Sequence, residues 1–98
     1  MYYVTVMYPN RDDVKFDFDY YTSKHIPMVS QLLDAKIEVC KGIDSLAGTP
    51  SPLRCTARIR VNSLEQFQAA MAEHGARIMG DIPNYCNVQP TVQIDEVL

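Results

Sequence analysis

Nine consecutive residues, Leu53–Val61, alternate without a break between apolar and polar side chains. The odd-numbered positions hold Leu, Cys, Ala, Ile and Val, whereas three of the four even-numbered positions hold arginine. Because successive side chains of a strand point to opposite faces, this segment predicts a β-strand with one buried face and one polar face. Such alternation is typical of antiparallel sheets that are covered on one side only.

Three further segments carry strand patterns. Residues 2–8 are rich in β-branched and aromatic side chains, and both faces are largely apolar, which favours a central strand. Residues 36–43 alternate again between apolar and polar positions. Residues 88–98 contain Pro90, which cannot donate to a ladder and therefore favours an edge strand or a bend.

Two segments carry helical patterns. In residues 16–33, Pro27 removes an amide donor and restricts the residue before it. We therefore predict a broken helix, with one piece ending near His25 and the other running from about Pro27 to Leu33. The second helix is predicted to begin after Ser63, the N-cap of a capping box, and to end near Met79.

The resulting order, β-α-β-β-α-β, is that of the ferredoxin-like α+β fold, a four-stranded antiparallel sheet with two helices on one face. A chain of 98 residues fits one such domain, residues 1–98. The other face of the sheet would be bare and would mix arginines with Glu38 and Asp95. Because opposite charges can satisfy one another across such a surface, we expect a homodimer through this face.

Composition excludes several classes of partner. The net charge of -3 provides no electrostatic footprint for nucleic acid. No apolar run is long enough to cross a bilayer, and the N-terminus lacks a secretory pattern, so we expect a cytoplasmic protein. Cys40, Cys55 and Cys86 are odd in number and lack CxxC spacing, which indicates neither a disulfide framework nor a metal site.

His25 is the strongest candidate for chemistry, because an imidazole titrates near neutral pH and can act as a general acid or base. Tyr21 lies four residues earlier, on the same helical face, and its hydroxyl could donate to a ligand oxygen. The structural alternative is that His25 caps a helix end beside Pro27. Tyr20, Tyr3, Phe67 and Met71 are further candidates for contacting a ligand, although the tyrosines and the apolar helical stripe equally suit core packing.

The run FDFDYYTSKHIPM, which begins at Phe16 after a short N-terminal strand, resembles the EthD-like family of dimeric α+β barrel proteins. The matching features are an aromatic and acidic helix start, a tyrosine, and His-x-Pro followed by an apolar residue: Tyr20 or Tyr21, His25, Pro27 and Met28. The resemblance implies a homodimer whose two sheets close a barrel with the helices outside. It also implies a small pocket between each sheet and its own helices, with no fixed metal or organic cofactor.

Members of this superfamily include small monooxygenases, isomerases, cyclases, decarboxylases and dehydratases that act on aromatic or polyketide-like substrates. If the protein is an enzyme, the resemblance favours a cofactor-free reaction of a catabolic or polyketide-type pathway, in which His25 moves a proton on a small aromatic or carbonyl compound and Tyr21 polarises its oxygen. Two alternatives stay open: a non-catalytic small-molecule-binding or accessory protein of a degradation operon, and a cofactor-free monooxygenase. Related barrels bind haem through a histidine, but no second feature beside His25 supports haem in this sequence.

Overall fold

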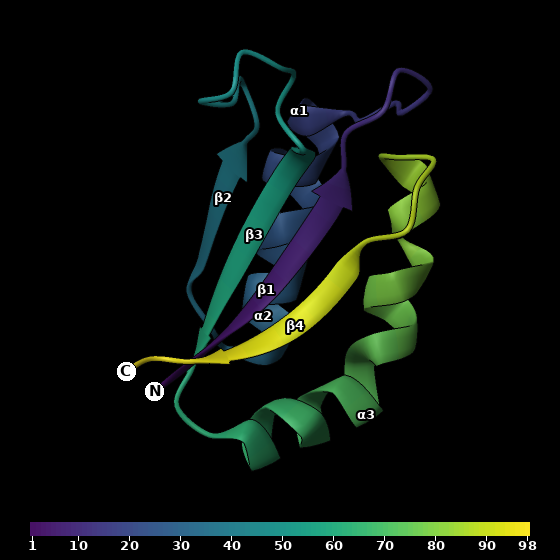
Figure 1. Ribbon diagram of the computed structural model, residues 1–98. Helices are drawn as coiled ribbons and strands as arrows, with labels where there is room; N and C mark the ends of the chain where they lie inside the picture. Colours follow the sequence, from purple (N-terminus) through teal and green to yellow (C-terminus); the bar gives the residue numbers. More distant parts are fainter.

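The computed structural model describes residues 1–98, and its elements follow the predicted order (Figure 1). Four strands form one antiparallel sheet in the order β2-β3-β1-β4. Their bounds are Tyr2–Pro9 for β1, Ile37–Lys41 for β2, Leu53–Val61 for β3 and Thr91–Glu96 for β4. The predictions of a central first strand and an edge position for the last strand are confirmed. β2 and β4 are shorter than predicted.

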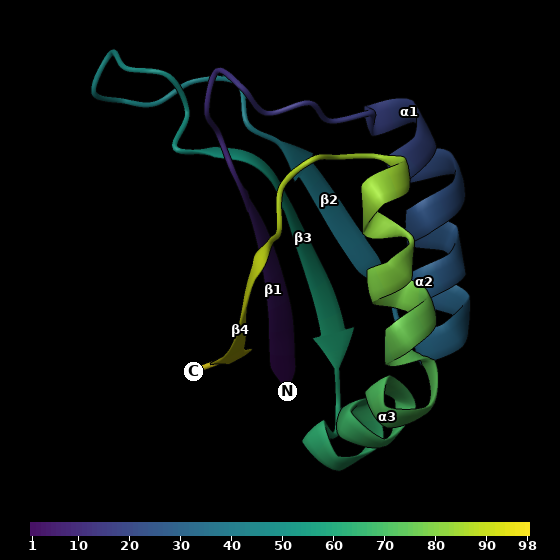
Figure 2. The ribbon, with the colours of Figure 1, turned by 90° about the vertical axis from the view of Figure 1, so that its right-hand side faces the viewer.

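The helices lie together on one side of the sheet, which leaves the other side bare (Figure 2). The first helical region consists of α1, a π-helical turn η1 and α2, and the second consists of α3 and a short 3-10 turn η2. α1 spans Phe18–Tyr20, η1 spans Tyr21–His25 and α2 spans Ile26–Leu33. α3 spans Leu64–Gly80, and η2 spans Ile82–Asn84. Ser63 caps α3 as predicted, because its hydroxyl oxygen accepts the backbone N–H of Gln66 at 3.2 Å.

The predicted break in the first helix is wrong, because the chain stays helical through Pro27. The N–H of Ile26 bonds to the carbonyl of Tyr21, five residues earlier, which closes a π-helical turn. Pro27 follows in the first turn of α2, where the spacing of the hydrogen bonds returns to four residues. The residue without an N–H therefore lies where the ladder changes its register, and the helix widens there instead of breaking.

Strand register places the apolar side chains on the helix side, as the alternation predicts. Val4 of β1 lies opposite Ile59 of β3 and Ile94 of β4. The central strands are well covered, and Val4 and Ile59 belong to one buried cluster. The side chains are less buried at the edge of the sheet, where Val92 of β4 remains 50% exposed. None of the helices has the length and apolar character that spanning a membrane requires.

Candidate functional site

A cavity of about 80 Å³ lies between the helix side of the sheet and the helices that cover it. Seventeen of its nineteen lining residues are hydrophobic, and they come from all four strands and from both helical regions. Among the lining residues, only His25 has a side chain whose ordinary pKa lies near neutral pH. Val92 and Met79 are the two exposed residues of the lining, at 50% and 46%.

The π-helical turn positions His25 in the wall of this cavity. Tyr21 and His25 are the first and last residues of η1, and both are buried. Their rings stack with centroids 5.4 Å apart and an interplanar angle of 16°. Because π turns often occur at functional sites, the widened helix is a second feature that favours a functional role for His25.

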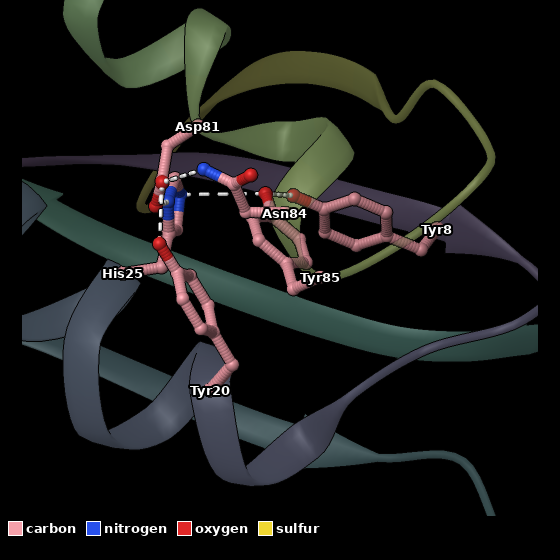
Figure 3. A network of polar contacts seen from close by, with 6 residues as sticks. All are labelled: Tyr8, Tyr20, His25, Asp81, Asn84 and Tyr85. Atoms are coloured by element: carbon pink, nitrogen blue, oxygen red, sulfur yellow. Dashed lines mark hydrogen bonds and ion pairs between the residues drawn. The ribbon is translucent and has the colours of Figure 1, made fainter.

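Both nitrogens of the His25 ring have partners from the segment that follows α3 (Figure 3). Nδ1 lies 2.8 Å from Oδ2 of Asp81, and Nε2 lies 3.3 Å from the hydroxyl oxygen of Tyr85. That hydroxyl lies 2.6 Å from the hydroxyl of Tyr8 on β1. A chain of polar groups therefore connects the C-terminal end of α3, the first helical region and the central strand.

The carboxylate of Asp81 is held by two more donors. Its Oδ1 accepts the Tyr20 hydroxyl at 2.7 Å and the side-chain amide of Asn84 at 2.9 Å. Asp81 immediately follows α3, and Asn84 ends η2, so a short turn places both groups beside the helix that carries Tyr20. Three donors from two segments thus orient this carboxylate towards His25 (Figure 3).

The environment keeps the imidazole neutral and the carboxylate ionised. Burial lowers the pKa of His25, and the bond to Asp81 opposes this shift only in part. Burial acts to raise the pKa of Asp81, but hydrogen bonds from Asn84, Tyr20 and His25 outweigh it and hold that pKa below its usual range. An ionised carboxylate can only accept, so Nδ1 of His25 carries the proton and Nε2 keeps its lone pair.

The buried tyrosines keep their protons. Burial raises the pKa of Tyr8 to about 12. Burial also raises the pKa values of Tyr21 and Tyr85 well above the ordinary value for a phenol. At neutral pH these three hydroxyls are therefore protonated and can donate hydrogen bonds. All three tyrosines line the cavity, whose other lining residues are mostly apolar.

A comparison with known protein families identifies the family of this chain. The model of the EthD domain matches residues 12–89, which include the histidine, both tyrosines of the first helix and Asp81. This chain belongs to the EthD family.

Similar proteins agree with this assignment. The EthD chain is 33% identical over 89 residues to an uncharacterised 11.0 kDa protein encoded between thcB and thcC in Rhodococcus erythropolis, a match covering 89% of this chain and 85% of that protein. An EthD-like protein from Ralstonia eutropha JMP134 has a crystal structure with 40% identity and a TM-score of 0.92, covering 99% of this chain and 91% of that one. An ethyl tert-butyl ether D family protein from Bacillus halodurans C-125 shares the fold, with 19% identity and a TM-score of 0.71 over 100% and 99% of the chains.

Four of the six predicted site residues of this EthD protein lie together. His25, Tyr21, Phe67 and Met71 all line the cavity. Tyr20 does not line it, and its hydroxyl instead binds Asp81 behind the histidine.

The expected place of Tyr3 at the pocket requires correction. Tyr3 lies on the bare face of the sheet, where the guanidinium carbon of Arg58 is 4.1 Å from its ring centroid. It points away from the helix side because it alternates with Val4 along β1, and Val4 lines the cavity.

Sequence reasoning missed Asp81, Asn84, Tyr85 and Tyr8 as members of the polar network. From the sequence, residues 81–84 (Asp-Ile-Pro-Asn) carry only turn signals, and Tyr8 belongs to a strand pattern. The available signal was the cluster Asp-Ile-Pro-Asn-Tyr directly after a helix, in which two polar groups and a tyrosine follow one another. His25 and Asp81 are 56 positions apart, so no local periodicity connects them.

The remaining titratable candidates do not form a second centre. No three His, Cys, Asp or Glu side chains gather closely enough to hold a metal ion. All three cysteines are free thiols; Cys40 is exposed, and Cys55 and Cys86 are buried. His74 lies on α3, 3.6 Å from the carboxylate of its neighbour Glu73.

Proposed function

We propose that this EthD family protein binds a small, largely apolar compound in the cavity and transfers a proton on it without a cofactor. The observation that carries the proposal is the Asp81–His25 pair in the wall of a cavity lined by hydrophobic side chains. His25 would act as the general base and acid. General acid–base catalysis by a positioned side chain contributes about 10²–10⁴-fold to a rate.

The electrostatics of the pair support this role. Asp81 orients the ring and would stabilise the imidazolium that forms when His25 accepts a proton. Because burial lowers the pKa of His25, the ring is in its basic form at neutral pH. Tyr21, stacked on that ring, would donate its hydroxyl hydrogen to a carbonyl or phenolate oxygen of the ligand.

The cavity supports a small aromatic or carbonyl compound as the ligand. Its walls offer apolar contacts on almost all sides and polar groups at one place, around His25. The volume of about 80 Å³ is smaller than the roughly 150 Å³ of an engineered cavity that holds benzene. A ring compound would therefore enter edge first and extend out beside Met79 and Val92, the two lining residues that are exposed to solvent.

Deuterium exchange tests the proposal without knowledge of the natural substrate. Indan-2-one has acidic protons next to its carbonyl, and their replacement in D₂O is followed by proton NMR. We expect the protein to accelerate this exchange and His25→Gln to lose about 10²-fold or more of the acceleration. His74→Gln, which changes the other histidine, serves as the matched control. Equal rates for His25→Gln and the unmodified protein would contradict the proposal.

One observation favours a second candidate, a non-catalytic ligand-binding or accessory protein. Both ring nitrogens of His25 already have partners within the protein, as a purely structural histidine would. In that case His25→Gln would lower the free energy of unfolding, and the chain would bind ring compounds without exchanging their protons.

Proton removal would also be the first step of a cofactor-free monooxygenase. Consumption of O₂ in the presence of an ionisable ring compound, measured with an oxygen electrode, distinguishes that activity. A cytoplasmic location is part of the same proposal.

A homodimer through the bare face of the sheet completes the proposed assembly. Arg58 and Glu38 lie directly opposite each other across β2 and β3 but form no ion pair with each other, so both charges are available to a second copy. Light scattering after size exclusion tests this. Arg58→Glu is expected to shift the protein towards the monomer, whereas Arg77→Glu, a charge reversal on the exposed side of α3, is not. A monomeric unmodified protein would refute the assembly.

A further inference from the structure

We propose that Tyr85 is the residue that takes the proton from the ligand, that His25 receives it through Tyr85, and that the ligand is a phenol or an enol. This inference rests on the proposed proton transfer and deepens it. It replaces direct contact between ligand and histidine by a relay through a tyrosine hydroxyl, and it assigns the ligand an acidic O–H group.

The geometry blocks the direct route. Tyr85 occupies the side of the imidazole where the free lone pair lies, with its hydroxyl oxygen 3.3 Å from Nε2. The two rings lie close, with centroids 4.6 Å apart. A ligand that approached Nε2 itself would have to displace this buried tyrosine, whereas a ligand at Tyr85 finds the hydroxyl already connected to the base (Figure 3).

The direction of the hydrogen bonds follows from Asp81. The carboxylate accepts from Nδ1–H of His25, so Nε2 must accept, and Tyr85 must donate to it. The Tyr85 oxygen then accepts from the Tyr8 hydroxyl 2.6 Å away. The hydrogen bonds therefore run in one direction, from Tyr8 to Tyr85 to His25 and on to Asp81, with each group donating to the next. Tyr8 and His25 are the only hydrogen-bond partners of the Tyr85 hydroxyl, and a phenolic oxygen can accept a further bond, so a ligand O–H can donate to it.

The relay balances as a transfer of two protons. The ligand O–H bond breaks, and its proton forms a new bond to the oxygen of Tyr85. The original proton of Tyr85 moves to Nε2 of His25, which becomes an imidazolium beside the carboxylate of Asp81. Tyr85 is neutral before and after, and the ligand is left as a phenolate or enolate to which the newly protonated Tyr85 hydroxyl can donate a hydrogen bond.

The surroundings favour simultaneous movement of the two protons. Titratable groups face this region from several elements: Tyr8 of β1, Tyr21 of η1, Cys55 of β3, and Asp81 and Cys86 on either side of η2. None is a cation, and burial raises the pKa of Tyr85. A free tyrosinate is therefore disfavoured, and Tyr85 releases its proton only as it receives another.

The ionisation of bound 4-nitrophenol tests the relay, because its phenolate absorbs visible light. At saturating protein, we expect bound probe to absorb as phenolate below the midpoint of free 4-nitrophenol, because its proton moves through Tyr85 to His25 and remains in the complex. The apparent ionisation midpoint should therefore fall by about one pH unit, a tenfold change in the apparent acid dissociation constant. Tyr85→Phe is expected to bind the probe and return the midpoint to that of free 4-nitrophenol, and His25→Gln to do the same. Tyr3→Phe, a tyrosine on the bare face, is the matched control and should keep the shift.

The alternatives give different results. A shift that survives in Tyr85→Phe but disappears in His25→Gln would overturn the relay and leave the proposed proton transfer by His25 intact. No binding or no shift in the unmodified protein would also overturn the relay, and exchange of indan-2-one would then decide the proposed function separately. If Tyr85→Phe does not fold, Tyr8→Phe tests the same chain. We expect it to retain less than half of the shift, and an unchanged shift overturns the relay.

Discussion

Replacing Asp81 by asparagine keeps the size of the side chain but removes the charge that orients His25. The carboxylate accepts three hydrogen bonds, from His25, Tyr20 and Asn84, at 2.7–2.9 Å. The amide has only one oxygen, so its NH₂ group must face at least one of these donors. We expect the His25 ring either to lose this partner or to change its tautomer.

The magnitude of the loss follows from the number of bonds. A hydrogen bond to an ionised group contributes about 1.5–3 kcal/mol, against about 0.5–1.5 kcal/mol for a neutral pair. Changing all three bonds from charged to neutral would therefore lower the free energy of unfolding by about 3 kcal/mol. The Asp81 side chain is 16% exposed, and solvent screening reduces the expected loss to about 2 kcal/mol. For a domain of this size, that corresponds to a decrease in Tm of about 8–16 °C.

Calorimetry at pH 7 measures this decrease directly. Asp13→Asn is the matched control, because Asp13 pairs only with Arg11 on the surface and should change Tm by no more than about 2 °C. Nitrogen NMR of the His25 ring adds a second measurement, since loss of the carboxylate should reduce the population of the Nδ1–H tautomer. An Asp81→Asn protein as stable as the unmodified one would refute the view that a carboxylate orients this histidine.

Three further results are expected. The pKa of His25 is lower in the folded than in the unfolded chain, so its contribution to stability is present above about pH 6.5 and is lost as the pH falls. Urea unfolding at a series of pH values should show this decline in the free energy of unfolding. A His25→Gln protein with the same decline would contradict this assignment. Met71→Trp should fill the cavity and weaken binding of 4-nitrophenol at least about tenfold, measured by absorbance titration. Thr22→Ala, on the exposed side of η1, should leave that binding unchanged.

The sheet is the part of the molecule that local patterns predict best. The period-two alternation of Leu53–Val61 directly reports which face is buried, and the structure has a strand with these bounds. Pro90 marks the start of the edge strand because proline has no backbone N–H to donate to a neighbouring strand. The end of β2 was less predictable. Ile43 fits the alternation but is 87% exposed, because the chain leaves the sheet after Lys41.

The site was predictable only in the half that is local in sequence. Tyr21 and His25 are four residues apart, and helical spacing alone brings their rings together. The partners of the histidine come from a turn more than fifty residues away, and only tertiary packing of α3 against the first helical region brings them there. The π turn was also beyond sequence reasoning, because a proline is compatible with a break, a kink or a change of helical register.

The energetics of the polar chain connect these observations to function. Buried polar groups must be desolvated, and apolar residues of similar volume would often stabilise a small core as well or better. A purely structural network could therefore lie anywhere in the interior. In this chain, Asp81, His25, Tyr85 and Tyr8 converge on the one apolar cavity between the sheet and its helices, where three of the four contribute to the lining. Their location, more than their hydrogen bonds, is what favours a role in chemistry over a role in folding.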